Sequence, residues 1–351
     1  MRFRVNALLL NVRSRPSLSG FVVKRLHAGD LLEHLDDRTE EENGIVWHAI
    51  YDPRDHTVGW CAAPYLTVIR DTSAPRGSKI GFHIAGGHVP DNLEQILREL
   101  RNSGKPLACA LVVNHGHLCR AIKEASPTTV VVYRPVLWGD DDNPASRGWM
   151  SGRDWFNRLW GHMHPYRQWV DYFQFENEWF VLPSRTEAEM RRFGQFFIEL
   201  METCELAGVR CLVGNIAVGN LDPHHEPALH EMFLRAERAG HPFDYHMYSS
   251  QHRNHDMLHE ADLYAARWHR WARKYPNLKF IFGETGSFHG PRYVDPQTTI
   301  AQMRQTEQLI QPFDSQVIGA CWWTLAGEPG GWGADDFAPA LPQVAQYLKA
   351  R

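Results

Sequence analysis

From residue 79 onward, short apolar runs alternate with longer stretches in which apolar residues recur every three or four positions. The runs stand near residues 80–84, 107–113, 130–133, 172–175, 211–213, 243–246, 280–282 and 317–322. Runs of this length are typical of strands buried on both faces, and the stretches between them are typical of helices that turn one face to a sheet. Eight repeats of strand and helix predict an α/β fold in which a parallel sheet closes into a (β/α)8 barrel over residues 79–351.

Two of the helical stretches have a clear apolar stripe. Apolar residues recur along 190–204 and along 257–271, which predicts one helix over each range. Thr186 and Glu189 have the spacing of a capping box, and Asp91 is a candidate cap for an earlier helix. A doubly wound open sheet is the alternative architecture, although neither a G-x-G-x-x-G fingerprint nor a P-loop follows any of the runs.

Residues 1–70 have a different pattern. Strand-like runs at 21–23, 45–50 and 58–60 are separated by Gly, Pro and acidic residues, without helical periodicity, which predicts a small all-β domain. Residues 71–78 are polar and contain proline and glycine, as interdomain linkers do. We therefore expect a β domain over 1–70, a linker over 71–78 and the barrel over 79–351.

Composition and charge narrow the range of partners. The net charge of −4 and the lack of a long Lys/Arg cluster argue against nucleic acid. The longest apolar runs fall far short of the roughly 20 residues that cross a bilayer, so no membrane association is expected. Asn11 and Arg13 interrupt the N-terminal apolar stretch before it reaches the length of a signal-peptide core, which favours a cytoplasmic protein or one released by another route. The six scattered cysteines lack C-x-x-C spacing and are expected to be buried free thiols.

Polar and aromatic side chains gather at the carboxyl ends of the predicted strands. In a β/α barrel, the loops at these ends build the active site. In chain order the residues are His83, Asn114, Arg134, Asn177 with Glu178, Asn215, His246 with Tyr248, Glu284, and Trp322 with Trp323. Such a set predicts an enzyme. Its two glutamates match the pair of carboxyl groups that most glycoside hydrolases need to cleave a glycosidic bond.

These strand ends resemble those of the clan-A glycoside hydrolases, which are TIM-barrel enzymes with an Asn-Glu pair after the fourth strand and a Glu after the seventh. Asn177-Glu178 and Glu284 stand at these two places. The segment Asp244-Tyr-His-Met-Tyr248 after the sixth strand and a Trp at the end of the eighth extend the resemblance. The resemblance implies a retaining mechanism in which Glu178 is the general acid and then the base, and Glu284 is the nucleophile.

The resemblance also implies roles for neighbouring side chains. Asn177 would bind the sugar 2-hydroxyl, Tyr248 would hydrogen-bond the nucleophile, and Trp322 or Trp323 would stack under the sugar ring. Trp179 offers an apolar neighbour that keeps Glu178 protonated, whereas Arg134 or Tyr248 would keep Glu284 ionised. The remaining candidates for the substrate cleft are His83, Asn114, His246 and the loop residue Trp138. Clan-A enzymes usually have an Arg after the second strand, where this chain has Asn114, so the residue that orients Glu284 is left open.

The N-terminal segment carries a second resemblance. Leu10-Asn-Val-Arg-Ser-Arg-Pro16, Leu26-x-x-Gly-Asp30, Trp47, Gly59-Trp60 and Tyr65-Leu66 occur in this order. They are similar to the successive signatures of a bacterial SH3-like (SH3b) domain. The resemblance implies a module that holds a hydrolase on a cell-wall ligand or serves as a spacer.

The twenty histidines leave a metal-dependent barrel hydrolase as an alternative. The candidate ligands are His115 with His117, His224 with His225, and His252 with His255 and His259. Such enzymes generally need a His pair at the end of the first strand and an Asp at the last. This chain has His83 alone at the first strand and Trp322-Trp323 at the last, so no metal and no cofactor are expected.

Together these patterns predict a retaining glycoside hydrolase that cleaves a β-linked glycan, with a polysaccharide or oligosaccharide as substrate. The SH3-like segment favours a cell-wall or capsule polymer, as for an endolysin-like or wall-remodelling enzyme. A neutral polysaccharide is the competing target, because Asn177 poised for a free 2-hydroxyl conflicts with the acetamido group of peptidoglycan sugars. A catalytically silent carbohydrate-binding barrel is the alternative function.

Overall fold

A computed structural model of the 351-residue chain shows two compact units, Met1–Arg76 and Gly77–Arg351. It describes residues 2–7, 9–27, 30–52, 54–55, 57–69, 77–137, 143–178, 185–250, 252–253, 255–287, 295–327 and 335–351. The proposed linker 71–78 lies outside these ranges except for its last two residues.

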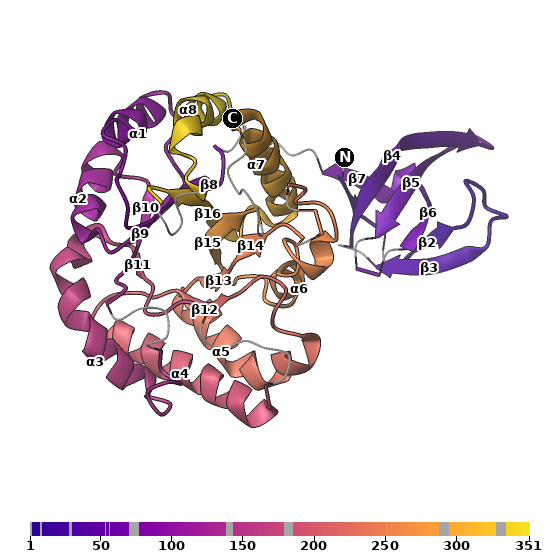
Figure 1. The fold of residues 1–351 in the computed structure, drawn as a ribbon. Helices are drawn as coiled ribbons and strands as arrows, with labels where there is room; N and C mark the ends of the chain where they lie inside the picture. The colour runs from indigo at the N-terminus through magenta and orange to yellow at the C-terminus, as the bar shows by residue number, and fades with distance from the viewer. Residues whose placement is uncertain are drawn as a thin grey trace. The chain divides into compact units, whose positions relative to one another are not determined.

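The N-terminal unit is an antiparallel sheet whose strands are connected in the order β3-β2-β6-β5-β4-β1-β7 (Figure 1). The strands are β1 (Arg2–Val5), β2 (Leu9–Arg13), β3 (Val22–His27), β4 (Leu31–Glu42), β5 (Ile45–Asp52), β6 (Thr57–Ala62) and β7 (Leu66–Ile69). Alternate residues of these strands point inward, as Phe3, Val12, Leu26 and Ile50 do in the core of the unit. The predicted all-β segment is confirmed.

The second unit is built on a parallel sheet, and its strands follow the predicted apolar runs (Figure 1). Its strands are β8 (Ile80–Ile84), β9 (Cys109–Val113), β10 (Val130–Arg134), β11 (Tyr172–Phe173), β12 (Val213–Ile216), β13 (Phe243–Tyr245), β14 (Met247–Tyr248), β15 (Phe280–Gly286) and β16 (Val317–Leu325). They are connected in the order β11-β10-β9-β8-β16-β15-β13-β12, and the short β14 pairs with β15. A parallel bridge between Phe173 and Cys211 joins the two ends of this order, so the sheet curls into a barrel.

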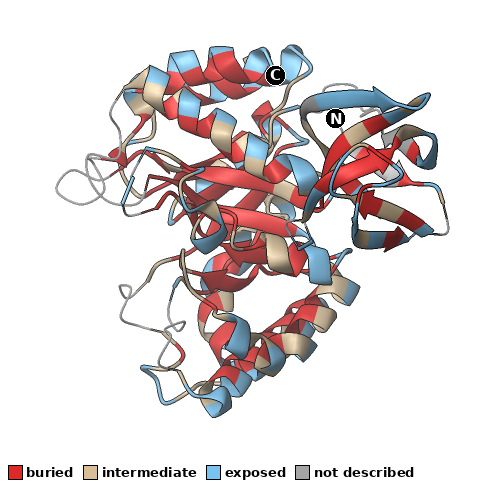
Figure 2. Ribbon diagram, turned by 90° about the vertical axis from the view of Figure 1, so that its right-hand side faces the viewer, coloured by how far each residue is buried: buried red, intermediate tan, exposed pale blue. Residues whose placement is uncertain are grey.

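Helices surround the barrel strands (Figure 1). In the described ranges they are α1 (Leu93–Asn102), α2 (Gly116–Ala125), α3 (Gly152–Met163), α4 (Glu187–Leu206), α5 (Glu226–Ala239), α6 (His269–Lys274), α7 (Pro296–Ile310) and α8 (Leu341–Lys349). Their inner faces are buried and their outer faces exposed (Figure 2), which is the pattern expected of helices that cover a sheet. The predicted α/β fold, with a β unit before a (β/α)8 barrel, is confirmed. None of the described helices has the length and apolar character needed to span a bilayer.

The capping box predicted at the start of α4 is confirmed. Thr186 accepts a hydrogen bond from the N–H of Glu189, and the Glu189 carboxylate accepts one from the N–H of Thr186. The expected cap at Asp91 is wrong, because Asn92 occupies the N-cap of α1 and no side chain caps that helix end.

The expected single helix over 257–271 is also wrong. The segment consists of turns, a short 3-10 helix at Ala261–Leu263 and only the start of α6. Glu260 has a left-handed backbone (φ 50°), which interrupts a helical path. Met257, Trp268 and Trp271 are nevertheless fully buried, so the apolar stripe indicated burial correctly but not the helix.

The barrel interior near β8 is packed around two cysteines. Sγ of Cys109 lies 3.2 Å from Sγ of Cys321, and all six cysteines are buried free thiols, as expected. Gly81 and Gly319 make room for this pair, because a Cβ at either position would lie 2.4 Å or less from Sγ of Cys109. This end of the core therefore depends on the absence of two side chains.

Candidate active site

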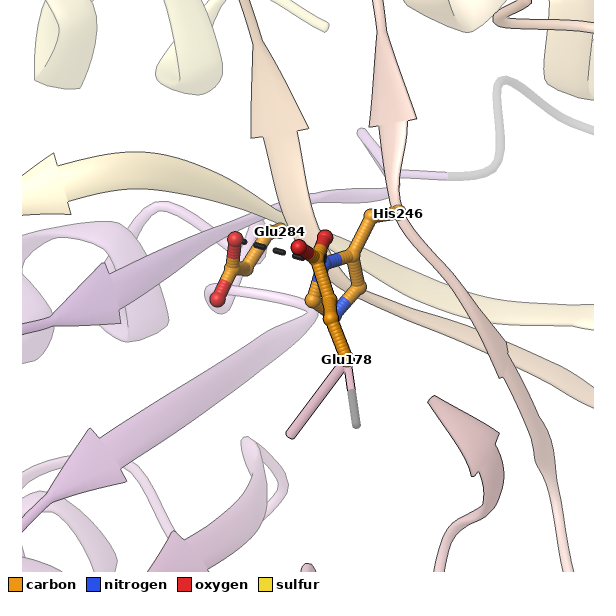
Figure 3. Close-up of side chains that lie close together, drawn as sticks. All are labelled: Glu178, His246 and Glu284. Atoms are coloured by element: carbon orange, nitrogen blue, oxygen red, sulfur yellow. Dashed lines mark hydrogen bonds and ion pairs between the residues drawn. The ribbon is translucent and has the colours of Figure 1, made fainter. Parts of the chain in front are cut away.

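Glu178 and Glu284 converge at the carboxyl ends of the barrel strands. Glu284 lies within β15, the seventh barrel strand, while Glu178 stands five residues beyond the end of β11, the fourth. An oxygen of each carboxylate lies within 4.8 Å of the other and of a ring nitrogen of His246. Figure 3 shows the side chain of Glu284 beside the imidazole of His246 and that of Glu178 reaching the same ring from a coil segment. Residues more than a hundred positions apart thus share one pocket.

His246 lies between the two carboxylates. Its Nδ1 contacts Oε1 of Glu178 and lies 3.3 Å from Oε2 of Glu284. The ring is fully buried. Burial on its own disfavours the imidazolium, but the charges and hydrogen bonds of Glu284 and Glu178 raise the pKa of His246 well above its ordinary value. We therefore treat His246 as a cation that bridges the two glutamates.

Glu284 is buried and surrounded by donors. Tyr248 donates a 2.8 Å hydrogen bond to its Oε2, and the guanidinium of Arg134 lies 3.6 Å from its Oε1. Burial alone would raise the pKa of Glu284, but the charges of His246 and Arg134 outweigh burial and hold this pKa well below its usual range. A carboxylate that stays ionised at neutral pH is suited to nucleophilic attack.

Arg134 links Glu284 to Asn177. Its Nη1 donates a 2.7 Å hydrogen bond to Oδ1 of Asn177 and also faces Glu284. Because Oδ1 is used in this way, the Nδ2 amino group of Asn177 is the part that remains to donate to a ligand. Arg134, the last residue of the third strand, is thus an arginine that contacts Glu284.

His83 and Trp323, on the first and eighth strands, pack against each other. The ring of His83 is buried. Its centroid lies 4.3 Å from the centroid of the Trp323 ring, and its Nδ1 lies 3.1 Å from Oγ1 of Thr324. Burial lowers the pKa of His83 to about 3, so the ring is neutral. The Trp323–Thr324 peptide bond is cis.

The two tryptophans at the end of β16 have different surroundings. Trp322 belongs to the main hydrophobic cluster and is almost completely buried. Trp323 is half-buried, and its indole N–H faces Oδ2 of Asp335 at 3.4 Å. Trp323 is therefore the better placed of the two for contact with a ligand.

For three of the predicted cleft residues, the structure gives no support for contact with a substrate. Asn114 is exposed, and its Oδ1 accepts a 2.6 Å hydrogen bond from the N–H of Val136, so its side chain secures the loop after β10. Trp138 and Trp179 lie outside the described residues. Their contribution to substrate binding stays a prediction.

Sequence reasoning did not assign a role to the buried acids beside the site. Asp244 is fully buried two residues before His246, and Glu176 is buried two residues before Glu178, where it contacts the side chain of Asn215. The available signal was position alone, because each acid stands two residues before a predicted site residue. Two acids therefore extend the polar cluster into the barrel interior.

The same residues include a set of possible metal ligands. In the described part of the chain, Glu178, His246 and Glu284 form the one group of three whose donor atoms are close enough to share an ion, and His252, His255 and His259 form no such group. Nδ1 of His246 already lies between the two carboxylates, and a proton there neutralises the same charges. The geometry supports acid–base chemistry by the side chains themselves.

Comparison with known proteins extends the fold description. No protein-family model matches the chain. No curated protein matches it either. Among solved structures, SrfJ from Salmonella typhimurium has a TM-score of 0.50 at 11% identity, over 99% of this chain and 84% of that one. This likeness shows a shared fold and carries no information on activity.

Two further solved structures are more distant. A glucosidase from Croceicoccus marinus gives a TM-score of 0.49 at 10% identity, over 78% of this chain and 68% of its own. XEG5A, a GH5 xyloglucan-specific endo-beta-1,4-glucanase from a metagenomic library, gives a TM-score of 0.46 at 13% identity, over 78% of this chain and 97% of its own.

Proposed function

We propose that this chain is a retaining glycoside hydrolase that cleaves a β-linked glycan with Glu178 and Glu284. The supporting observation is the approach of the two carboxylates, whose nearest oxygens lie within 4.8 Å. Retaining enzymes hold their carboxyl groups about 5–5.5 Å apart, whereas inverting enzymes need about 6.5–9.5 Å to admit a water molecule. The separation favours double displacement.

In the first step Glu284 attacks the anomeric carbon. A bond forms between its carboxylate oxygen and that carbon while the bond to the leaving oxygen breaks, and Glu178 gives its proton to the leaving oxygen. Glu284 is buried among donors, and the side chain of Glu178 is 35% exposed. The donors around Glu284 suit a nucleophile, and the exposure of Glu178 leaves its carboxyl group accessible to a leaving oxygen and then to water.

In the second step water releases the glycosyl group. Glu178, now a carboxylate, removes a proton from the water, which attacks the anomeric carbon and frees Glu284. His246 contacts both carboxylates through Nδ1, so it can share a proton with Glu178 and hold positive charge next to Glu284. The histidine thus links the protonation states of the two glutamates.

Neighbouring groups would position the sugar. With Oδ1 of Asn177 held by Arg134, its Nδ2 can donate to a 2-hydroxyl. Trp323 would supply a flat apolar face for the ring. A free 2-hydroxyl favours a neutral β-glycan over peptidoglycan, whose sugars carry an acetamido group there.

Substitution of each glutamate tests the proposal. Glu284→Gln should abolish turnover of aryl β-glycosides, and Glu178→Gln should reduce turnover by about 10²–10⁴-fold, most severely for poor leaving groups. Azide should restore activity to Glu178→Ala and yield a glycosyl azide of retained configuration. Glu187→Gln, an exposed residue of α4, is the control.

Three outcomes would contradict the proposal. Unchanged turnover in both variants would remove the glutamates from the chemistry, and an inverted product anomer would exclude double displacement. A glycan that the native protein binds but never cuts would identify a silent binding barrel instead.

We also propose that residues 1–70 form an SH3-like module that binds a cell-wall polymer. The antiparallel sheet over this segment supports the module, and Phe21, which is 85% exposed, offers an apolar contact. Phe21→Ser in the full chain should weaken co-sedimentation with insoluble cell walls. Leu206→Ser, equally exposed on the other unit, is the matched control, and equal binding by both variants and the native protein would contradict this role.

A further inference from the structure

Asp244 lies in the barrel interior beside His246. Its Oδ1 accepts a 2.7 Å hydrogen bond from the N–H of Gly283, the residue before the nucleophile. Its Oδ2 lies 3.4 Å from Nε2 of Gln174 and 3.9 Å from Nε2 of His246. One buried carboxylate therefore faces both the strand that carries Glu284 and the ring that bridges the two glutamates.

A buried carboxylate is unfavourable for folding unless charge and hydrogen bonds compensate it. Asp244 is fully buried, and burial raises its pKa to about 6, although His246 and the N–H of Gly283 act in the opposite direction. An apolar residue of similar size would fill this position at lower cost in stability. The retention of a carboxylate here points to a role beyond packing.

The neighbouring strand is shaped to admit this carboxylate. A Cβ at position 283 would lie 2.6 Å from Oδ2 of Asp244 and 3.1 Å from a methyl carbon of Leu111. Any larger residue there would displace the Asp244 side chain. Glycine at 283 thus allows Asp244 to approach the nucleophile's backbone.

The other nitrogen of His246 has a single polar neighbour. Nδ1 is directed at Glu178 and Glu284, while Nε2 has no hydrogen-bond partner among the described residues and faces Oδ2 of Asp244. A carboxylate on the far side of an imidazole fixes the ring orientation and favours a proton on the nearer nitrogen.

We propose that Asp244 is a positioning residue for the catalytic glutamates, which fixes the backbone before Glu284 through the N–H of Gly283 and orients His246 from its Nε2 side. This inference rests on the proposed function. It predicts that a residue that never touches substrate sets the pH range in which the two glutamates work.

The direction of the pH effect follows from the charges around Asp244. The groups that face it are His246, Glu284 and Arg134, together with the thiol of Cys321. Asp244 is charged only above a pH of about 6, where Glu284 is already ionised, so loss of this charge acts on His246 and makes it easier to deprotonate. The basic limb of the activity profile should therefore move to lower pH, by about one unit for a neighbouring charge at this distance, while the acid limb should stay in place.

Asp244→Asn tests the inference in the full-length protein. We expect kcat to fall about 10- to 100-fold, KM to change less than about twofold, and the basic limb of the kcat profile to shift to lower pH. Asp171→Asn is the matched control, because Asp171 also accepts a 2.7 Å hydrogen bond from a strand N–H, that of Val131, but at the start of β10. The control should leave the pH profile unchanged.

The outcomes separate this inference from the proposed function. Inactive Glu178→Gln and Glu284→Gln variants together with an unshifted profile for Asp244→Asn would overturn the role of Asp244 alone. Full activity in both glutamine variants would overturn the proposed function instead.

A measurement on the native protein covers the case in which Asp244→Asn does not fold. Nitrogen NMR of labelled histidine should show Nε2 of His246 protonated across the active pH range. Loss of that proton while activity persists would overturn the inference.

Discussion

Tyr248 donates its phenolic hydrogen bond to Oε2 of Glu284 over 2.8 Å. The contact is held by the backbone, because the short strand β14 pairs with β15 and aligns Tyr248 with Gly286, two residues beyond the nucleophile. The donor and the carboxylate therefore sit on adjacent strands at a fixed register. Such preorganised donors stabilise the charge of a carboxylate without reorganisation during the reaction.

Tyr248→Phe removes this donor with little change in shape. We expect kcat/KM to fall about 10- to 100-fold, because a hydrogen bond to a charged group contributes about 1.5–3 kcal/mol. Steady-state kinetics on an aryl β-glycoside measures the loss. Tyr166→Phe, on the periphery of the barrel, serves as control, and equal activity of the two variants would count against a role for the Tyr248 hydroxyl.

Trp323→Ala removes the proposed sugar platform. Substrate binding should weaken by about 1–2 kcal/mol, seen mainly as an increase in KM or in the dissociation constant of an oligosaccharide bound to the Glu284→Gln protein. Trp169→Ala is the control. Trp169 ends the 3-10 helix after α3, and its ring packs against Arg120 instead of the candidate site. An unchanged affinity after loss of Trp323 would place the sugar elsewhere.

His83 should make the protein sensitive to acid. Its folded pKa of about 3 lies below the ordinary 6.5, so the unfolded chain binds the proton more readily between these values. The contribution of His83 to stability is therefore complete above pH 6.5 and is lost as the pH falls toward 3, by at most about 1.4 kcal/mol per unit.

Chemical denaturation between pH 7.5 and 4.5 checks this prediction. His83→Gln should be less stable than the native protein at pH 7.5, and the difference should narrow toward pH 4.5. His88→Gln, at an exposed position, should follow the native protein throughout. Parallel curves for His83→Gln and the native protein would refute the assignment.

Gly319→Ala should destabilise the barrel by about 1–3 kcal/mol, because the new methyl group would overlap Sγ of Cys109 at 2.3 Å. Cys109→Ala should recover part of this loss in the double variant. It should not rescue Gly81→Ala, whose methyl group also meets the carbonyl oxygen of Cys109 at 2.3 Å. Gly161→Ala on α3 has open space and should be neutral or slightly stabilising. Additive effects of Gly319→Ala and Cys109→Ala would exclude the contact.

The barrel strands could be predicted from sequence because a parallel strand buried on both faces appears as a continuous apolar run. The run at 80–84 coincides with β8, and the run at 243–246 extends β13 by one residue. The prediction of a single helix over 257–271 was wrong for a different reason. The apolar spacing of this segment reflects burial of Trp268 and Trp271, whereas the left-handed backbone at Glu260 that breaks the helix leaves no mark on that spacing.

The carboxylates could be predicted as a pair, but their connection could not. Strand-end position placed Glu178 and Glu284 in one pocket, whereas His246 was expected only to bind substrate. The direction of its ring depends on contacts with residues 38 and 68 positions away in the chain. Asp244 was named only as part of the segment after the sixth strand, because the sequence does not show which groups its side chain faces.

The two glutamates are attached to the barrel in different ways. Glu284 stands inside β15, a strand of seven residues, whereas the regular part of β11 ends at Phe173, five residues before Glu178. Glu284, the proposed nucleophile, thus stands within a paired strand, while Glu178, the proposed proton carrier, stands beyond the sheet. In the proposed reaction, Glu284 must form a covalent bond at one fixed position, which suits a residue held within a strand. Glu178 must give a proton to a leaving oxygen and then take one from a water molecule, which suits a residue with more freedom to move.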